Sequence, residues 1–173
     1  SNTDNVLCLG INISVFCDFF VAPSGVITSL TLPLVSLPNE IIFEEIRQKK
    51  ILDHLQGEIK KEVKYGKNSR VDIFINNPKG KDCFIEVKSV TLSRIKGLAE
   101  FPDAKTTRGS KHLIELGKMS KQGHDCYLVY LIQRKDINIF SIAKDIDEEY
   151  YKNSIIAKKN GVNFIAFSCE VSK

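Results

Sequence analysis

The chain has 173 residues, a length that suits one domain with a full hydrophobic core. Hydrophobic residues make up 43% and charged residues 27%, proportions of a folded soluble protein rather than of a disordered or fibrous chain. The formal net charge is +4, from 25 Lys and Arg against 21 Asp and Glu. This mildly basic balance permits a polyanionic partner without requiring one. Whether the chain binds such a partner depends on where the charges lie along the sequence.

The five cysteines, Cys8, Cys17, Cys83, Cys126 and Cys169, are odd in number and form no Cys-x-x-Cys pair. Cys83, Cys126 and Cys169 lie in or beside apolar, strand-like runs, so we interpret them as buried free thiols in a reducing cytosol. Disulfides or a zinc site are the less favoured alternatives, and only three histidines are present. We therefore expect a cytoplasmic protein.

The first part of the chain, residues 1–38, is rich in β-branched and aromatic residues and is expected to be a strand-rich segment preceding an α/β domain over residues 39–173. No secretory signal is evident. Residues 15–36 are apolar enough to raise a membrane question, but Asp18, Pro23, Gly25 and Pro33 interrupt them. A membrane-spanning helix needs about 20 mostly apolar residues, so we expect no membrane insertion.

From Asn39 onward the spacing of apolar residues predicts helices and strands clearly. Asn39 can cap a helix of about four turns that ends near Gly57. Residues 59–63 form a weak strand candidate, and residues 71–75 and 83–87 form two stronger ones. The segment between them has a strong turn composition, so these two strands should make an antiparallel hairpin. Residues 98–109 have a loop-like composition.

The second half of the domain alternates helices and strands. Ser110 can cap a helix over residues 111–121 that ends at Gly123. Residues 127–132 are continuously apolar, as in a strand covered on both faces. A helix over 147–159 and a strand over 164–167 follow, which suggests a right-handed parallel crossover. The fold class is therefore α/β, with helices around a mixed sheet.

The two strands of the predicted hairpin contain the candidate catalytic residues. A turn centred on Lys79 places Asp72 directly opposite Glu86, with their Cβ atoms about 5 Å apart on one face. Lys88 lies two residues beyond Glu86, so it shares that face. Opposed carboxylates repel, and a divalent cation such as Mg²⁺ is a natural compensator that can also activate water toward a phosphodiester. Lys88 could orient that water. Alternatively, the face is merely solvated and Lys88 pairs with Glu86.

Two further groups bear on the site. One of two helix acids, Glu44 or Glu45, could supply a further metal ligand, although helix-surface acids are usually solvated. A basic cluster surrounds the hairpin and the start of the second long helix, where hydroxyls and cations make a phosphate site. The alternative is a solvated basic loop, and for its histidine an ordinary helix-surface position. The candidate nucleic-acid-binding residues are Lys64, Arg70, Thr107, Arg108, Lys111 and His112.

The sequence around these candidate site residues also resembles that of a known protein family. Residues 37–171 resemble the sugar fermentation stimulation protein A (SfsA) family, and the similar blocks are collinear. They are residues 37–39 (LPN), 62–66 (EVKYG), 69–73 (SRVDI), 84–92 (FIEVKSVTL), 101–104 (FPDA), 107–113 (TRGSKHL) and 133–134 (QR).

The resemblance implies a restriction-endonuclease-like core of the PD-(D/E)XK type. Asp72 would then be the first metal-binding acid and Glu86 and Lys88 the E-x-K pair, with the Val87 carbonyl as a further metal ligand. Family members usually begin with an OB-type β-barrel lobe, which we expect to be missing or truncated here. Residues 15–36 look like an insertion.

Three functions remain open from the sequence. The first is a Mg²⁺- or Mn²⁺-dependent nuclease acting on DNA, or alternatively on RNA. The second is a non-catalytic, nonspecific DNA-binding protein that regulates genes of sugar metabolism. The third is a structural or regulatory protein of carbohydrate metabolism that binds no nucleic acid.

Overall fold

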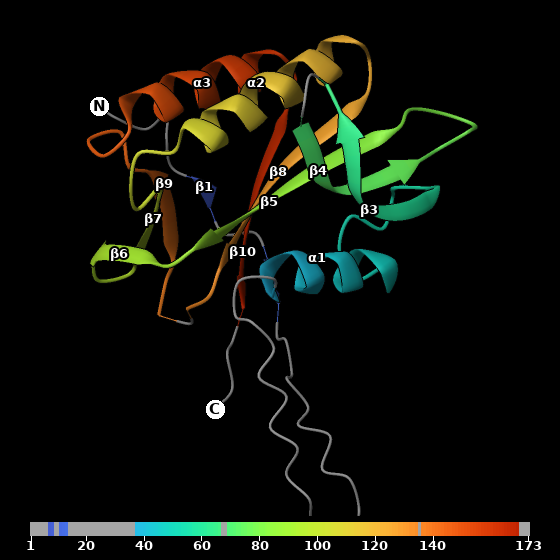
Figure 1. Cartoon of the computed structure of the whole chain (residues 1–173). Helices are drawn as coiled ribbons and strands as arrows, with labels where there is room; N and C mark the ends of the chain where they lie inside the picture. The colour runs from blue at the N-terminus through green and yellow to red at the C-terminus, as the bar shows by residue number, and fades with distance from the viewer. Residues whose placement is uncertain (1–6, 9–10, 14–36, 67–68, 135, 170–173) are drawn as a thin grey trace, which may run out of the picture.

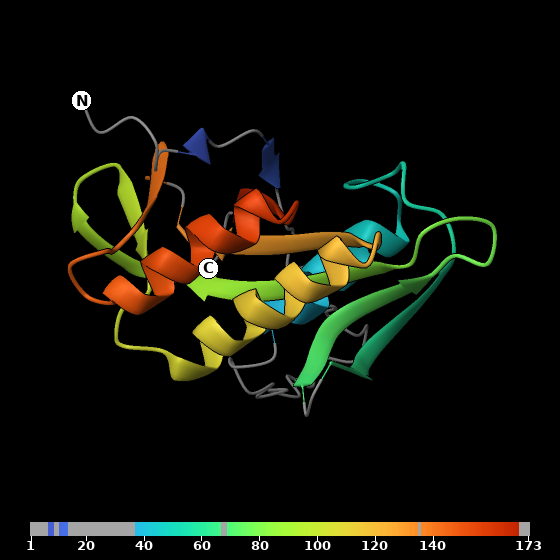
Figure 2. The same cartoon turned by 90° about the horizontal axis from the view of Figure 1, so that it is seen from above.

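The computed structural model describes residues 7–8, 11–13, 37–66, 69–134 and 136–169. A six-stranded mixed sheet separates helix α1 on one face from helices α2 and α3 on the other (Figure 1). Seen from above, α2 and α3 lie side by side over that face (Figure 2). The strands, in spatial order, are β2 (Ile11–Ile13), β10 (Asn163–Cys169), β8 (Asp125–Ile132), β5 (Cys83–Val90), β4 (Ser69–Asn76) and β3 (Glu58–Tyr65).

The predicted hairpin is confirmed, together with its register. Strands β4 and β5 are antiparallel and pair Ile73 with Ile85 and Phe74 with Phe84. One further step in this register sets Asp72 opposite Glu86. The turn is stabilised locally, because the Asn77 side chain accepts a hydrogen bond from the backbone N–H of Lys79.

The weak strand candidate is also real, and longer than expected. Strand β3 runs antiparallel to β4 and extends the sheet at its edge. On the other side of β5, strands β8 and β10 run parallel to it and to each other. The predicted parallel pairing of the last two strands of the sheet is therefore confirmed.

A second, four-stranded sheet was not expected. Its strands are β1 (Leu7–Cys8), β9 (Ile139–Ile142), β7 (Leu98–Phe101) and β6 (Leu92–Ile95). The prediction of a loop from residue 98 was wrong, because β7 pairs in parallel with β9 about forty residues later. A four-residue strand stabilised by so distant a partner leaves only a weak local pattern.

Helix α1 (Leu37–Arg47) is shorter than predicted. The chain leaves it through Lys49 and Leu52, which have positive φ angles of 58° and 49°. Ile51 and Leu55 are nevertheless buried against the same core as α1. Because Ile51 and Leu55 have the spacing of buried helix residues, the sequence wrongly predicted that the helix continues through them. Asn39 lies within the helix rather than capping it.

Helix α2 (Thr107–Lys121) begins one turn before its predicted start. Thr106 caps it by accepting a hydrogen bond from the Gly109 backbone N–H, whereas Ser110, the predicted cap, is buried inside the helix. Helix α3 (Glu148–Lys159) is confirmed, with Asp147 as its cap.

Two hydrophobic clusters hold the layers together, one between the sheet and α2 and α3, the other between the sheet and α1. Cys83 and Cys126 are buried free thiols, as predicted. The other cysteine side chains lie outside the described residues, as does nearly all of the expected 1–38 segment. No helix within the described ranges is long and apolar enough to span a bilayer.

Candidate metal and nucleic-acid site

Asp72 is positioned by backbone as well as by side-chain contacts. The ladder between β4 and β5 stops at Ile73 and Ile85, and beyond it Asp72 Oδ2 accepts a hydrogen bond from the Val87 backbone N–H at 2.7 Å. Its other oxygen, Oδ1, accepts from the Asn39 side chain on α1 at 3.0 Å. Asp72 therefore ties α1 to the middle of the sheet.

Glu86 is almost fully enclosed, with 2% of its side chain exposed. Its Oε1 accepts a hydrogen bond from Lys88 Nζ at 2.8 Å and also bonds to Nδ1 of His112, from helix α2. Oε2 is buried and has no hydrogen-bond partner among the described residues. One oxygen of this carboxylate is thus neutralised, and the other is available to a ligand.

The two carboxyl groups titrate in opposite directions. Burial, and then the negative charge of Glu86, raise the pKa of Asp72 to about 7, against the smaller opposing effects of the Val87 N–H and Lys88. Burial acts to raise the pKa of Glu86 as well. The hydrogen bond from His112 and the charge of Lys88 outweigh it and hold that pKa below its usual value. At neutral pH the pair therefore carries one full negative charge and part of a second.

The donor atoms fit a hard cation better than a soft one. The described residues hold no cluster of three or more His, Cys, Asp or Glu side chains that could ligate a metal. Two carboxylates and a backbone carbonyl suit Mg²⁺, which keeps several waters and takes few protein ligands. Zinc, which prefers nitrogen and sulfur, lacks its usual set. The unpartnered Glu86 Oε2 is the atom that most needs such a ligand.

Glu44 and Glu45, the predicted additional acids, are engaged elsewhere. Glu44 forms an ion pair with Arg47, and Glu45 forms one with Lys50. The α1 residue that contacts Asp72 is Asn39, which the sequence suggested only as a helix cap. The Val87 backbone does lie at Asp72, through its N–H. Since the N–H and C=O of a strand residue face the same neighbour, the Val87 carbonyl is expected on the β4 side of β5 as well.

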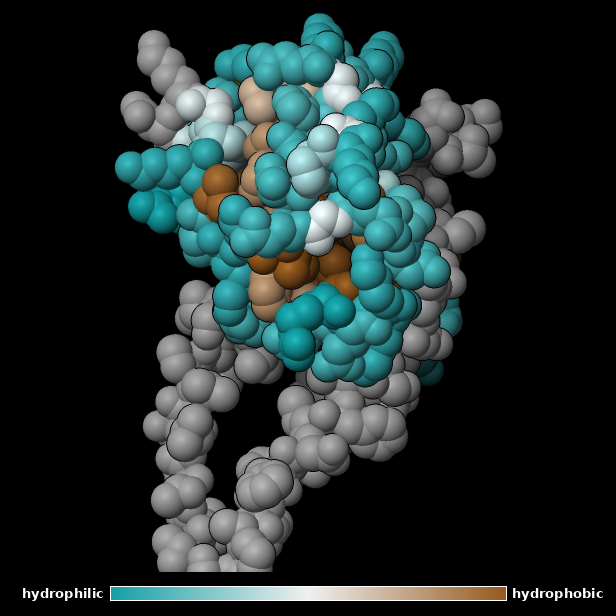
Figure 3. All heavy atoms as spheres, turned by 90° about the vertical axis from the view of Figure 1, so that its right-hand side faces the viewer, coloured by the Kyte–Doolittle hydropathy of each residue, from teal (hydrophilic) through white to brown (hydrophobic). Residues whose placement is uncertain are grey.

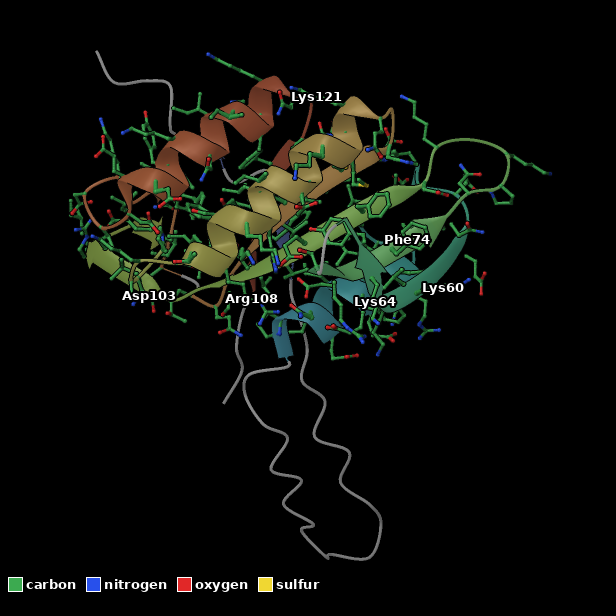
Figure 4. All side chains as sticks on the ribbon, turned by 45° about the horizontal axis from the view of Figure 1, so that its top comes forward. Lys60, Lys64, Phe74, Asp103, Arg108 and Lys121 are labelled. Carbon is green, nitrogen blue, oxygen red and sulfur yellow. The ribbon has the colours of Figure 1, made fainter. Side chains whose placement is uncertain are left out.

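A basic cavity of about 630 Å³ lies beside the carboxylates. It is bounded by the end of β3, the start of β4 and the first turns of α2. Figure 4 shows Lys64 on β3 and Arg108 on α2 on the same side of the molecule. Of the predicted nucleic-acid-binding residues, only Thr107, exposed at the start of α2, is not in the cavity lining. The lining residues are Lys64, Tyr65, Gly66, Ser69, Arg70, Arg108, Lys111 and His112.

The cavity is electropositive. Within the part of the chain that the structure describes, Lys64, Arg70 and Arg108 form no ion pair with a carboxylate, and Arg70 bonds only to the Glu62 carbonyl. Uncompensated cations around a concave surface concentrate anions there. His112 belongs to both parts of the site, because it lines the cavity and bonds to Glu86.

Tyr65, Gly66 and Ser69 were not predicted as site residues. Gly66 has a φ of 53°, and a Cβ there would lie 2.1 Å from Oε2 of Glu115. The positive φ favours glycine here, and any larger residue would also require the Glu115 side chain to move. The Tyr-Gly pair at the end of β3 is the local signal that could have marked this wall.

A larger cavity, of about 1020 Å³, lies on the four-stranded sheet. Its acids are largely neutralised, since Arg94 pairs with both Glu100 and Asp145. None of the predicted site residues lines it. The smaller basic cavity is therefore the better candidate site.

Sequence comparisons identify relatives across most of the chain. Residues 36–173 match the family model described as the sugar fermentation stimulation protein RE domain. A sugar fermentation stimulation protein homolog of Pelagibacter ubique is 51% identical over 114 residues, which cover 66% of this chain and 49% of the relative. A homolog of the same description from Bartonella henselae is 42% identical over 139 residues, covering 79% of this chain and 59% of the relative. The chain thus spans about half the length of the curated relatives it matches.

The fold is similar to that of a solved protein. The structure of Pyrococcus furiosus SfsA in complex with Ca²⁺ matches with a TM-score of 0.66 and 30% sequence identity, over 75% of this chain and 56% of that one. With the family model covering residues 36–173, the resemblance noted in the sequence is confirmed. The chain belongs to the sugar fermentation stimulation protein family.

Proposed function

We propose that this chain is a divalent-metal-dependent nuclease acting on DNA, or alternatively on RNA. One observation carries the proposal. Glu86, buried in the sheet with Oε2 unpartnered, lies opposite Asp72 and beside Lys88, next to a basic cavity. A buried acidic pair beside an anion-attracting cavity has the parts that metal-assisted phosphodiester hydrolysis needs.

The roles follow from the contacts. Asp72, Glu86 and the Val87 carbonyl would hold Mg²⁺ or Mn²⁺. When bound, such a metal supplies an acidified water and stabilises charge on the phosphate. Lys88, whose Nζ lies 2.8 Å from Glu86 Oε1, would hold the attacking water beside the carboxylate. His112 fixes the Glu86 side chain.

The substrate phosphates would bind to Lys64, Arg70, Arg108 and Lys111 in the cavity, with Thr107 at its edge. The order of elements in the six-stranded sheet supports a PD-(D/E)XK core, since α1 is followed by the three antiparallel strands β3, β4 and β5 and then, after the inserted strands β6 and β7 of the second sheet, by α2 and β8, which is parallel to β5. The Pyrococcus furiosus neighbour was solved with Ca²⁺, a hard cation that takes oxygen ligands as Mg²⁺ does.

The test is a cleavage assay on plasmid DNA, single-stranded DNA and single-stranded RNA, in Mg²⁺, Mn²⁺ or EDTA. Asp72→Asn, Glu86→Gln and Lys88→Ala should each abolish metal-dependent cleavage. Glu148→Gln, which alters an exposed ion pair with Lys152 on α3, is the control for contaminating nuclease and should cleave normally. Cleavage that survives in all three site variants would exclude this active site.

A non-catalytic DNA-binding protein is the second candidate. It is favoured by the fact that Glu86 Oε1 pairs with Lys88 and bonds to His112, so that the charge of this carboxylate has a partner within the protein. This candidate predicts DNA binding in EDTA that weakens steeply with salt, because phosphate contacts release counterions. It would be supported by the absence of cleavage of any of the three substrates in either metal.

A further inference from the structure

We propose that the site takes an unpaired nucleic-acid strand, with its phosphates in the basic cavity and a base stacked on Phe74. The inference rests on the proposed function for the position of the site, and it adds the class of substrate. Single-strand sites elsewhere combine a positive groove that follows the backbone with aromatic side chains on which bases stack.

The cavity favours an unpaired strand by its size. A volume of about 630 Å³ lies in the range that encloses a small organic ligand, and it suits one or two nucleotides. A duplex presents its phosphates on a convex surface and keeps its bases stacked inside. Enzymes that must enclose a nucleotide therefore act on single strands or extrude the nucleotide from the helix.

Phe74 supplies the stacking surface. Its side chain is only partly buried, and its ring lies 5.0 Å from that of Phe84, which lies 5.6 Å from the ring of Tyr65 in the cavity wall. Lys60 pairs directly opposite Phe74 on β3. Figure 4 shows Phe74 on β4 beside the strand that carries Lys60 and Lys64. Phe74 is thus the partly exposed end of a row of rings that reaches the cavity wall through the buried Phe84 and Tyr65, and Lys60, which pairs with Glu58, lies opposite it.

The side of the molecule that carries β3 and β4 presents both apolar and hydrophilic side chains (Figure 3). Figure 3 views the side on which β3 and β4 lie and shows apolar side chains in a hollow bordered by hydrophilic ones. A base needs an apolar platform, and its phosphate needs a charged border.

The cavity wall also contains polar groups that lack partners. Tyr65 and Ser69 line the cavity, and Tyr65 Oη and Ser69 Oγ are buried without a hydrogen-bond partner among the described residues. A buried hydroxyl without a partner is unfavourable, so such groups commonly mark a place where a ligand or water belongs. The oxygens of a nucleotide can accept from both hydroxyls.

The test is equilibrium binding by fluorescence anisotropy in EDTA, where metal-dependent cleavage cannot occur. The probes are labelled oligothymidylate and oligouridylate of about 12 nucleotides and a blunt DNA duplex with the same number of phosphates. We expect at least one single strand to bind about tenfold or more tightly than the duplex, and the two single strands distinguish DNA from RNA. Equal or tighter binding of the duplex would overturn the proposal.

A matched pair of variants tests the stacking surface. Phe74→Leu should weaken single-strand binding about fivefold or more and leave duplex binding unchanged. Phe164→Leu is the control, because Phe164 is also partly buried against the same core but lies on β10. Thermal melts establish that both variants are folded. Equal effects of the two variants on single-strand binding would also overturn the proposal.

The outcome is separable from that of the proposed function. Cleavage confined to duplex substrates, with duplex-preferring binding in EDTA, would refute the single-strand inference and leave the nuclease intact. Selective single-strand binding without cleavage in any metal would support the single-strand inference and refute the nuclease proposal.

Discussion

Asp72 Oδ2 accepts a 2.7 Å hydrogen bond from the backbone N–H of Val87, so that a carboxylate occupies the place where the neighbouring strand would otherwise bond. The backbone of β5 therefore fixes the position of the Asp72 carboxylate. Because the same carboxyl is desolvated and faces Glu86, its pKa rises to about 7. The site therefore has a cost in stability, and this cost can be measured.

Replacing Asp72 by Asn should stabilise the metal-free protein at high pH. The pKa of Asp72 is raised from 3.8 to about 7 on folding. A raised folded-state pKa contributes stability that is fully present below pH 3.8 and is lost as the pH rises through 7. At pH 8 the variant should thus exceed the wild type in free energy of unfolding by roughly 2–4 kcal/mol. Urea unfolding in EDTA at pH 5 and 8 measures the difference, and a variant less stable at pH 8 would contradict the assignment.

Replacing Asn39 by Ala should weaken metal binding without removing any ligand. The Asn39 side chain donates to Asp72 Oδ1 at 3.0 Å and so orients the carboxylate. Loss of such an outer hydrogen bond lowers metal affinity by about 10-fold or more. Calorimetric titration with Mn²⁺ measures the change. Asn153→Ala, on α3, is the matched control, and comparable affinities of the two variants would refute the positioning role.

His112→Ala should destabilise the fold, although His112 lies at the site. Its ring is buried and bonds to Glu86 Oε1, so removing it leaves a buried carboxylate with fewer partners. The expected loss in free energy of unfolding is about 1–3 kcal/mol. His54→Ala provides the comparison, because His54 is exposed and bonds to Tyr127 Oη from outside the site. Chemical denaturation that shows no larger loss for His112→Ala would contradict the prediction.

Two tyrosine-to-phenylalanine changes should have opposite effects. Tyr65 Oη has no partner, so Tyr65→Phe should keep the ring packing against Phe84 and raise the free energy of unfolding by about 1 kcal/mol. Tyr130 Oη bonds to Tyr150 Oη at 2.8 Å, so Tyr130→Phe leaves a buried hydroxyl unpaired and should lower it by about 1–3 kcal/mol. Melting temperatures in EDTA distinguish the two, and a destabilised Tyr65→Phe would show that its hydroxyl has a structural partner.

The hairpin register could be predicted because its information is local. The turn composition between β4 and β5 and the alternation of both strands determine which residues face each other, and this brought Asp72 opposite Glu86. The extent of α1 could not be predicted, because Ile51 and Leu55 bury apolar side chains from a non-helical backbone.

The contacts that complete the site depend on tertiary structure. Asn39 reaches Asp72 across 33 positions, and His112 reaches Glu86 across 26. The same holds for the second sheet, since β7 and β9 are short and stabilise each other across a long connection. Sequence patterns identified the types of residue at the site, whereas only the packed layers reveal which of them meet.

His112 lines the basic cavity and also bonds to Glu86, so binding of a phosphate in the cavity and of a metal at Glu86, as proposed, would be coupled through this residue. A cation that draws the glutamate toward itself would alter the contact that holds the imidazole, and an anion lodged against the imidazole would act on the glutamate in return. Such coupling has to be reciprocal. If a bound phosphate raises the affinity of the site for the metal, the bound metal must raise the affinity for the phosphate by the same factor. The His112 side chain would be the route of this coupling.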